Sequence, residues 1–248
     1  MIGMALFAVL MCVNFTACSD SDDEPDVNGE NPTTKKLLRS IKTDDSELKL
    51  FTYNSKGQLT KVTCDYNTMT LEWTDSGIYL STTAYWTELE AILSLKDGII
   101  VRSSCDYNNI KITYDNSKHI IKTVDEDNDT WSSYTWDSNN IISFDSNYSC
   151  TYYTDIRNVH PTVEIRCLDL ETVCPLEWAT IDVEDLLIAH PNLIGESCKN
   201  PIKSISDDSE TTSFTYEFDN EGYPTKIIEK ETGKYGGSTT TTFILTWE

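Results

Sequence analysis

The sequence predicts an all-β protein: an antiparallel β-meander of successive hairpins forming a curled or barrel-like sheet, with one short helix near residues 182–190. The chain has 32 threonines but 7 alanines, three of them within the first 17 residues. Threonine favours strands and alanine favours helices. Turn clusters of Asn, Asp and Gly also recur along the chain and separate short runs in which apolar residues alternate with polar ones.

The first segment, residues 1–17, is predicted to be a lipoprotein signal peptide. It is almost wholly apolar but shorter than the roughly 20 residues that a membrane-spanning helix needs. It ends in Phe15-Thr16-Ala17 before Cys18, which resembles a bacterial lipobox. That resemblance implies cleavage before Cys18 and acylation of its sulfur by diacylglycerol, with palmitate as a further acyl group. No Lys or Arg precedes the apolar run, unlike most export signals, so a start codon upstream of Met1 remains open, as do an ordinary secretory leader and a buried strand.

Residues 18–34 are predicted to form an acidic, disordered tether, because they are polar, contain Pro and Gly, and lack periodicity. The acidic run after Cys18 resembles the surface-export signal of Bacteroidota lipoproteins. We therefore expect an outer-membrane lipoprotein that faces the cell surface, with a plain spacer on a periplasmic protein as the alternative. Residues 35–248 are predicted to form a single β-rich domain.

Within this domain the hairpins repeat. One theme is an aromatic or apolar residue, threonine and an aromatic residue, followed by a polar turn and an apolar return strand. It occurs at residues 51–53, 112–114, 134–136 and 214–216. A second repeat places Cys64-Asp65-Tyr66-Asn67 41 residues before Cys105-Asp106-Tyr107-Asn108. A lone hairpin is marginally stable and sheets of more than about ten strands tend to curl, so the hairpins should pair into one curled sheet. The last strand should span Thr239–Trp247.

The segment Ile181–Pro191 breaks the strand pattern and is predicted to be the helix. Asp182 can cap its first turn, acidic residues lie near its amino end, and Pro191 marks its stop. Val183, Leu186 and Leu187 should face the sheet, so the helix could plug or brace an open end of the curled sheet.

Three stretches, Ile181–Leu187, Gly195–Ile205 and Phe214–Ile227, resemble a family of uncharacterised Bacteroidota lipoproteins, a domain of unknown function with a porin-like fold. Tyr134–Ile141 fits a further strand of that family, whereas Cys198 departs from its pattern. The resemblance covers residues 37–248 and implies an all-antiparallel sheet with no known activity. A true outer-membrane porin is a poorer interpretation, because its strands need about ten residues with an apolar, lipid-facing side.

Six cysteines remain after Cys12 and Cys18 are set aside: Cys64, Cys105, Cys150, Cys167, Cys174 and Cys198. In an exported chain they could form up to three disulfides, and Cys167 and Cys174 are close enough in sequence to close a small loop. Buried thiols are the alternative. The acidic run Asp125–Asp129 fails the calcium-loop pattern, since Thr130 and Trp136 stand where Gly and Glu are needed. We therefore expect an acidic hairpin turn there, and no metal or other cofactor.

The formal net charge of −22 argues against nucleic acid as a partner. Trp131, Tyr134 and Trp136 are candidates for a ligand-stacking surface, although alternation places Trp131 on the opposite face from the other two, and core packing is the alternative. No catalytic residue is predicted. We expect a non-enzymatic binding or structural module, anchored to the outer membrane through Cys18, whose partner is a glycan or a surface protein; the alternative is an envelope polysaccharide hydrolase with two paired carboxylates.

Overall fold

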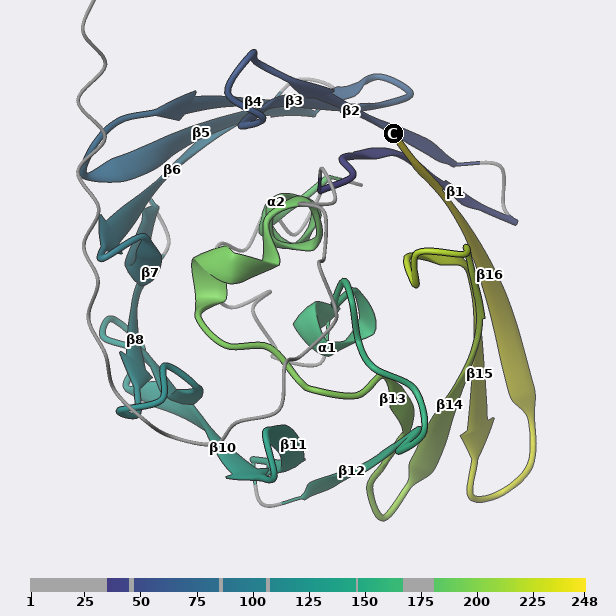
Figure 1. Cartoon of the computed structure of the whole chain (residues 1–248). Helices are drawn as coiled ribbons and strands as arrows, with labels where there is room; N and C mark the ends of the chain where they lie inside the picture. Colours follow the sequence, from purple (N-terminus) through teal and green to yellow (C-terminus); the bar gives the residue numbers. More distant parts are fainter. Residues whose placement is uncertain (1–34, 45–46, 85–86, 106–107, 146, 167–180) are drawn as a thin grey trace, which may run out of the picture. The chain divides into compact units, whose positions relative to one another are not determined.

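The described residues form a closed antiparallel barrel. A computed structural model describes residues 35–44, 47–84, 87–105, 108–145, 147–166 and 181–248, and the compact unit is Lys36–Glu248. Sixteen strands are found in the described part of the chain, and each pairs with its neighbours in sequence. Pairing between the first strand and the last closes the barrel (Figure 1). The predicted all-β meander is confirmed, and its curled sheet is a closed one.

The strands are β1 (Leu38–Thr43), β2 (Leu48–Tyr53), β3 (Leu59–Cys64), β4 (Asn67–Trp73), β5 (Gly77–Ala84), β6 (Thr87–Lys96), β7 (Ile99–Cys105), β8 (Asn109–Tyr114), β9 (Ile120–Asp125), β10 (Thr130–Asp137), β11 (Asn140–Phe144), β12 (Tyr148–Tyr152), β13 (Ile202–Ser206), β14 (Glu210–Phe218), β15 (Pro224–Gly233) and β16 (Ser238–Trp247). The four predicted repeat hairpins are β2–β3, β8–β9, β10–β11 and β14–β15.

The apolar side of each strand faces the inside of the barrel. On β4, Met69 and Leu71 are buried while Thr70 and Glu72 are exposed, as expected for alternation across a pleated strand. β5 continues the same layer with the buried residues Ile78 and Leu80. The buried side chains form one core that reaches around the barrel from Leu38 to Leu245.

The outer side of the barrel is largely polar, with exposed apolar side chains such as Leu50, Tyr79 and Ile92 among the polar ones. Cross-strand neighbours on this side are often hydroxyl residues, as in Thr68 opposite Thr83 and Thr70 opposite Ser81. β14 repeats the pattern, since Thr215 and Glu217 are exposed around the half-buried Tyr216. A membrane-embedded barrel has the reverse polarity, with a lipid-facing apolar band about 25 Å tall. Along β4 and β14 the outward residues therefore do not form such a band.

The short helices found in the described residues lie inside the barrel and belong to the connection between β12 and β13 (Figure 1). They are α1 (Val163–Arg166), α2 (Val183–Ala189) and the 3-10 helix η2 (Pro191–Ile194). The predicted helix near residues 182–190 is thus confirmed as α2; α1 and η2 were not predicted. We call residues 153–166 and 181–201 the inner segment.

The local sequence explains how α2 begins and what it buries. Asp182 is its N-cap and accepts the Glu184 N–H at 2.8 Å, while the Asp185 carboxylate accepts the Asp182 N–H at 3.1 Å. This reciprocal capping satisfies amides that have no partner within the first helical turn. Val183 and Leu186 are buried, as the sequence predicts, and so are all residues of α2 except Glu184.

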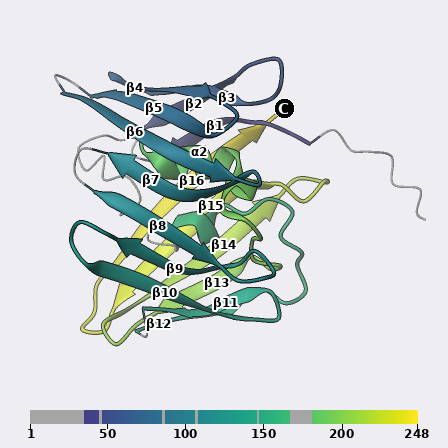
Figure 2. The same cartoon turned by 90° about the vertical axis from the view of Figure 1, so that its left-hand side faces the viewer.

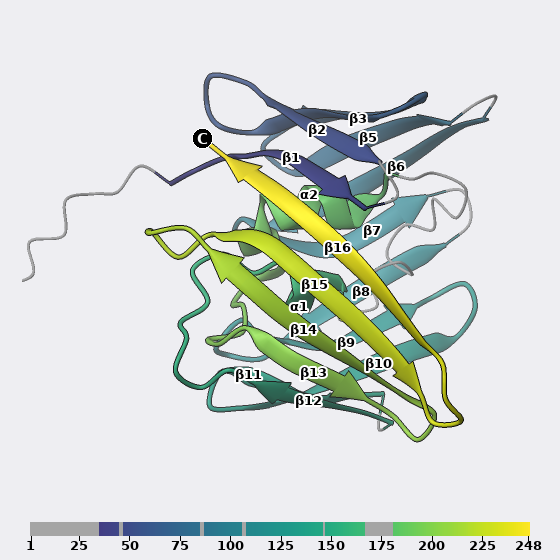
Figure 3. The ribbon, with the colours of Figure 1, turned by 90° about the vertical axis from the view of Figure 1, so that its right-hand side faces the viewer.

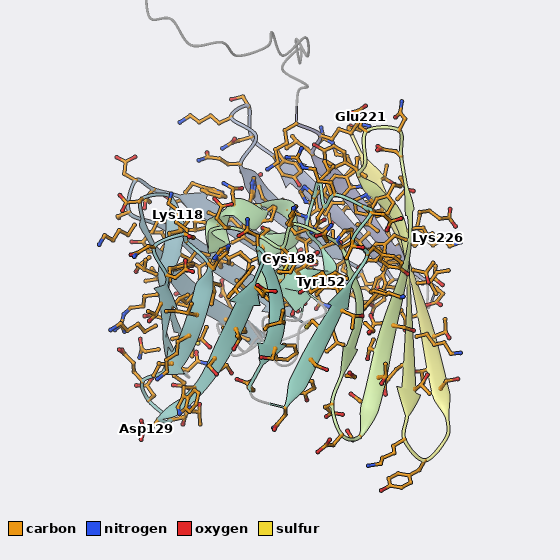
Figure 4. The ribbon with its side chains drawn as sticks, turned by 60° about the horizontal axis from the view of Figure 1, so that its bottom comes forward. Lys118, Asp129, Tyr152, Cys198, Glu221 and Lys226 are labelled. Atoms are coloured by element: carbon orange, nitrogen blue, oxygen red, sulfur yellow. The ribbon has the colours of Figure 1, made fainter. Side chains whose placement is uncertain are left out.

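The inner segment is attached to the hairpin turns at one end of the barrel. The His190 Nε2 accepts the Leu59 N–H at 3.0 Å, and the Glu196 N–H donates to the Lys118 carbonyl at 3.0 Å. Gly195 has a φ of 82°, and a Cβ there would lie 2.2 Å from the Lys118 oxygen, so only glycine fits this contact. Figure 4 places Lys118 at the end of the barrel to which the inner segment is attached, and Asp129 at the opposite end.

Aromatic donors account for the last residue of three of the four repeat motifs, Tyr114, Trp136 and Tyr216. At each of six places, the strand pairing shifts by one residue, which frees a carbonyl from the ladder. An aromatic side chain of the following strand donates to that carbonyl; the pairs are Trp73 to Leu59, Tyr114 to Ile100, Trp136 to Ile120, Tyr152 to Ile141, Tyr216 to Ile202 and Trp247 to Pro224, at 2.5–2.8 Å. Each acceptor is a residue at which a register shift occurs. These six aromatic side chains therefore provide hydrogen bonds to carbonyls that the register shifts leave without a partner in the sheet.

Candidate functional site

The structure separates the three aromatic residues that the sequence singles out, all of which lie on β10. Trp131 is on the outer face with 59% of its surface exposed, whereas Tyr134 is buried in the core. Trp136 also points inward: its Nε1–H donates to the Ile120 carbonyl, and its ring stacks on His119 with 4.3 Å between centroids. Only Trp131 of these three is placed to meet a ligand from solvent.

The surroundings of Trp131 combine an aromatic face with basic side chains. The Lys122 Nζ lies 4.9 Å from the Trp131 ring centroid, which is a cation–π contact. Across the sheet, Trp131 is opposite Val124, and Val124 is opposite the exposed Lys111 on β8. Figure 2 shows these strands, β8 to β10, side by side on one wall of the barrel.

The turn beside Trp131 is the acidic run Asp125–Asp129. The Asp125 carboxylate accepts the N–H groups of Asp127 at 3.0 Å and of Asn128 at 3.2 Å, and also the Asn128 side-chain amide at 2.7 Å. These hydrogen bonds, led by the Asn128 amide, hold the pKa of Asp125 below its usual range. The run thus forms the hairpin turn between β9 and β10. Within the described ranges, no group of three or more His, Cys, Asp or Glu side chains is arranged to hold a metal ion.

A second feature of the outer face is a groove of about 760 Å³ over β4 to β7. Its exposed apolar side chains are Tyr79 and Ile92, which are opposite each other on β5 and β6. Glu72 is opposite Tyr79, and Glu90 lies one row away, opposite Ser81. The groove therefore places two carboxylates beside an exposed aromatic ring.

Inside the barrel, a cavity of about 240 Å³ lies between the inner segment and strands β1, β2, β15 and β16. One of its walls holds an ion pair in which the Lys49 Nζ donates to both oxygens of Asp185 at 2.9 Å. The Asp185 side chain is 2% exposed and that of Lys49 is 20% exposed. The pair joins β2 to α2 across 136 residues of sequence, a contact that the strand pattern alone does not indicate.

Burial governs the electrostatics of this interior. It raises the pKa of Asp185 to about 6, and the Lys49 ammonium opposes that rise. For Lys49, burial would lower the pKa, but the Asp185 and Asp182 carboxylates raise it above its ordinary value. Glu164 on α1 is also buried, which raises its pKa to about 7. Shifted carboxyls beside a cavity are typical of binding sites as well as of structural ion pairs.

Several predicted features fall outside the described residues: Cys18, the leader, the tether, and the pair Cys167 and Cys174. Of the other cysteines, Cys198 is buried and its Sγ lies 3.6 Å from the Tyr152 hydroxyl (Figure 4). Burial raises the pKa of Cys198 to about 12 and that of Cys150 to about 11. Both sulfurs are therefore protonated and poorly nucleophilic at neutral pH. Among the described helices, none has the length and apolar character needed to cross a membrane.

Comparison with known proteins supports the fold. No family model matches the chain, and no curated protein matches it. Among solved structures, a porin-like protein from Bacteroides uniformis is 20% identical, with a TM-score of 0.65 over 88% of this chain and 99% of that one. A porin-like protein from Bacteroides vulgatus is 11% identical, with a TM-score of 0.50 over 85% of this chain and 98% of that one. The chain thus has the fold of these porin-like proteins over nearly their whole length.

Proposed function

We propose that this protein is an outer-membrane lipoprotein of the cell surface whose barrel stands in water as a non-enzymatic binding module. The observation that carries this proposal is the polarity of the barrel, which is apolar inside and rich in Thr, Ser, Lys and Glu outside. Among the described residues this polarity differs from that of a porin, which has a lipid-facing apolar belt and a polar lumen. An acyl anchor at Cys18 would supply the membrane attachment that the barrel surface lacks.

Binding is assigned to the outer face around Trp131, and the partner class is a glycan. A planar indole that is 59% exposed offers an apolar platform, and the neighbouring Lys111, Lys122 and Ser133 offer hydrogen-bond donors to sugar hydroxyls. Exposed aromatic residues with polar neighbours are typical of surfaces that bind partners. A surface protein is the other partner class for the same face.

The anchor is tested by mass spectrometry of the protein from a native membrane fraction, together with protease treatment of intact cells. The expected result is an amino terminus at Cys18 that carries acyl chains, with barrel peptides released from intact cells. A Cys18→Ala variant should appear in the soluble fraction. An unmodified Met1, or a barrel that resists protease until cells are broken, would contradict the anchor or the surface location respectively.

Binding is tested on a glycan array with the wild-type protein and with Trp131→Ala. The matched control is Ile142→Ala, which truncates another exposed apolar residue of the outer face, on β11. Loss of a glycan signal in Trp131→Ala alone supports the assignment. Equal signals for all three proteins would place glycan binding elsewhere, and no signal for any of them would favour the surface-protein partner.

The groove over β4 to β7 favours a second candidate, an envelope polysaccharide hydrolase, because glycosidases use two carboxylates on either side of the scissile bond. Glu72 and Glu90 would be the pair, with Tyr79 as the sugar platform. Reducing-end release from envelope polysaccharide by the wild type, abolished in both Glu72→Gln and Glu90→Gln, would support this candidate. Activity that survives both substitutions would exclude this pair.

A further inference from the structure

Two lysines lie beside Trp131 on the outer face of the barrel, and all three side chains surround Val124. Val124 is opposite Trp131 on one side and opposite Lys111 on the other. Lys122 precedes Val124 by two residues on β9 and therefore points to the same face, which its cation–π contact with Trp131 shows directly. Lys111 and Lys122 are diagonal neighbours across β8 and β9, about 7–8 Å apart at the backbone. Two ammonium groups and one indole are thus within reach of a single ligand.

Neither ammonium is neutralised by the protein. Both lysines are exposed, and within the described ranges neither forms an ion pair. The two acidic residues that follow β9 have other partners. Glu126 forms an ion pair with Arg102, and the Asp127 carboxylate accepts the Asn109 side-chain amide at 2.8 Å. Lys111 and Lys122 therefore remain available to a negatively charged group from outside.

The other nearby carboxylates do not fill this role. Asp145 accepts the Ser133 N–H at 3.0 Å, on the far side of β10 from Lys122. Asp129 lies at the end of the barrel (Figure 4), four residues from the Ser133 that is opposite Lys122, or roughly 13 Å along an extended strand. The chain as a whole repels anions, with a net charge of −22. However, this repulsion is screened beyond about 8 Å at physiological ionic strength, so the local lysines decide contact affinity.

From this geometry we infer that the Trp131 face binds an acidic glycan. An anionic substituent, a carboxylate or a sulfate, pairs with Lys111 and Lys122, while the apolar side of a sugar ring lies on the Trp131 indole. A lysine acts as a point charge without the fixed fork of arginine, so either anion fits. A neutral glycan gains only the indole and hydrogen-bond contacts, whereas a polyanion without sugar rings gains only the charges. The inference rests on the proposed function, because it names the class of glycan that this same face binds.

The test is titration of the full purified chain, at about 0.15 M salt, with polymers that differ in charge on one backbone. Polygalacturonate is compared with its methyl ester and dextran sulfate with dextran, while poly-L-glutamate is a polyanion without sugar rings. We expect the acidic polysaccharides to bind at least tenfold more tightly than the neutral polymers and than poly-L-glutamate. If only one of the two binds in this way, its carboxylate or sulfate is the recognised group.

The other outcomes overturn the inference in distinguishable ways. Equal binding of acidic and neutral polymers would reject the acidic class and leave the glycan assignment intact. Equal binding of poly-L-glutamate would make the face a general polyanion surface. If neither acidic polysaccharide binds, the inference is wrong, and the glycan array with Trp131→Ala still decides the proposed function separately.

Paired variants then locate the charges. Lys111→Gln/Lys122→Gln should weaken binding of the acidic polysaccharide at least tenfold. Lys203→Gln/Lys230→Gln removes the same charge from exposed positions on β13 and β15 and should leave binding unchanged. Figure 3 shows β13 and β15 on the opposite wall of the barrel from β8 to β10. If both variants weaken binding equally, the effect is one of net charge and the assignment to the Trp131 face is wrong. Urea unfolding checks that each variant is folded, and the polymer series on the wild type needs no variant.

Discussion

Glu164 is a carboxyl group that the barrel buries with few compensating partners. Its oxygens accept hydrogen bonds from the Asn158 side-chain amide and from the Thr162 N–H, at 3.0 Å for the latter. Among the described residues no cation forms an ion pair with it. Burial therefore dominates and raises its pKa from an ordinary 4.5 to about 7. The folded chain consequently holds a proton on Glu164 at pH values where the unfolded chain has lost it.

The free energy of unfolding then depends on pH in a defined way. Below pH 4.5 the group is protonated in both states and has no effect, whereas above pH 7 it is ionised in both and its burial is fully unfavourable. Between these limits the unfolded state binds fewer protons, so stability falls as pH rises. At 1.36 kcal/mol per pKa unit, the shift from 4.5 to about 7 is worth about 3 kcal/mol.

The assay is urea unfolding of the wild type and of Glu164→Gln from pH 4 to pH 8. The stability of the variant relative to the wild type should increase by about 3 kcal/mol over this range. Only the change of this stability difference with pH tests the reasoning. Its value at pH 4 also reflects altered hydrogen bonding, because a glutamine amide cannot accept from both Asn158 and Thr162 in the same way. Glu72→Gln, on the exposed outer face, should show no such trend. A stability difference between Glu164→Gln and the wild type that changes by less than about 0.5 kcal/mol from pH 4 to pH 8 would refute the reasoning.

Three further predictions concern stability, each with a matched control measured by urea unfolding. Trp136→Phe leaves the Ile120 carbonyl without its donor and should cost about 1–3 kcal/mol, whereas Trp131→Phe should cost less than about 0.5 kcal/mol. Gly195→Ala should cost about 1–3 kcal/mol more than Gly236→Ala, because both have a positive φ but only the former meets a backbone oxygen. Lys49→Met leaves Asp185 buried without its cation and should cost about 3–5 kcal/mol at pH 8, with less at pH 5, while Lys226→Met breaks an exposed pair worth under about 1 kcal/mol.

The fold was within reach of sequence analysis because its information is local. Alternation predicts the faces of strands such as β4, and the residues after Tyr53, Tyr114 and Trp136 form the turns that make hairpins. The sequence shows that an aromatic residue recurs in the hairpins, but it does not show why it recurs. The reason lies in a register shift of the preceding strand, and a one-residue bulge leaves no distinct sequence pattern. Barrel closure likewise depends on pairing between β1 and β16, at opposite ends of the chain.

The candidate sites show the same limit. Alternation correctly separates Trp131 from Tyr134 and Trp136, because side-chain direction follows from position along one strand. The cavity could not be predicted, since its walls come from strands and helices that only tertiary packing brings together. One sequence feature did indicate the ion pair. Lys49 alternates in step with Phe51 and Tyr53, which point inward on β2, so its side chain also points inward. A lysine inside the barrel needs a counter-ion. The sequence does not say which of 41 acidic residues supplies it.

The seam between β1 and β16 has a consequence for biosynthesis. The Leu37 and Glu248 backbones exchange hydrogen bonds, so the end of β16 joins the beginning of β1. A ribosome or an export channel that releases the polypeptide from its amino end must therefore deliver β16 before the ring can be completed. Until then β1 and the newest strand each present an unpaired edge, which invites aggregation. Both edges are covered once β16 (Ser238–Trp247) pairs with β1 and β15.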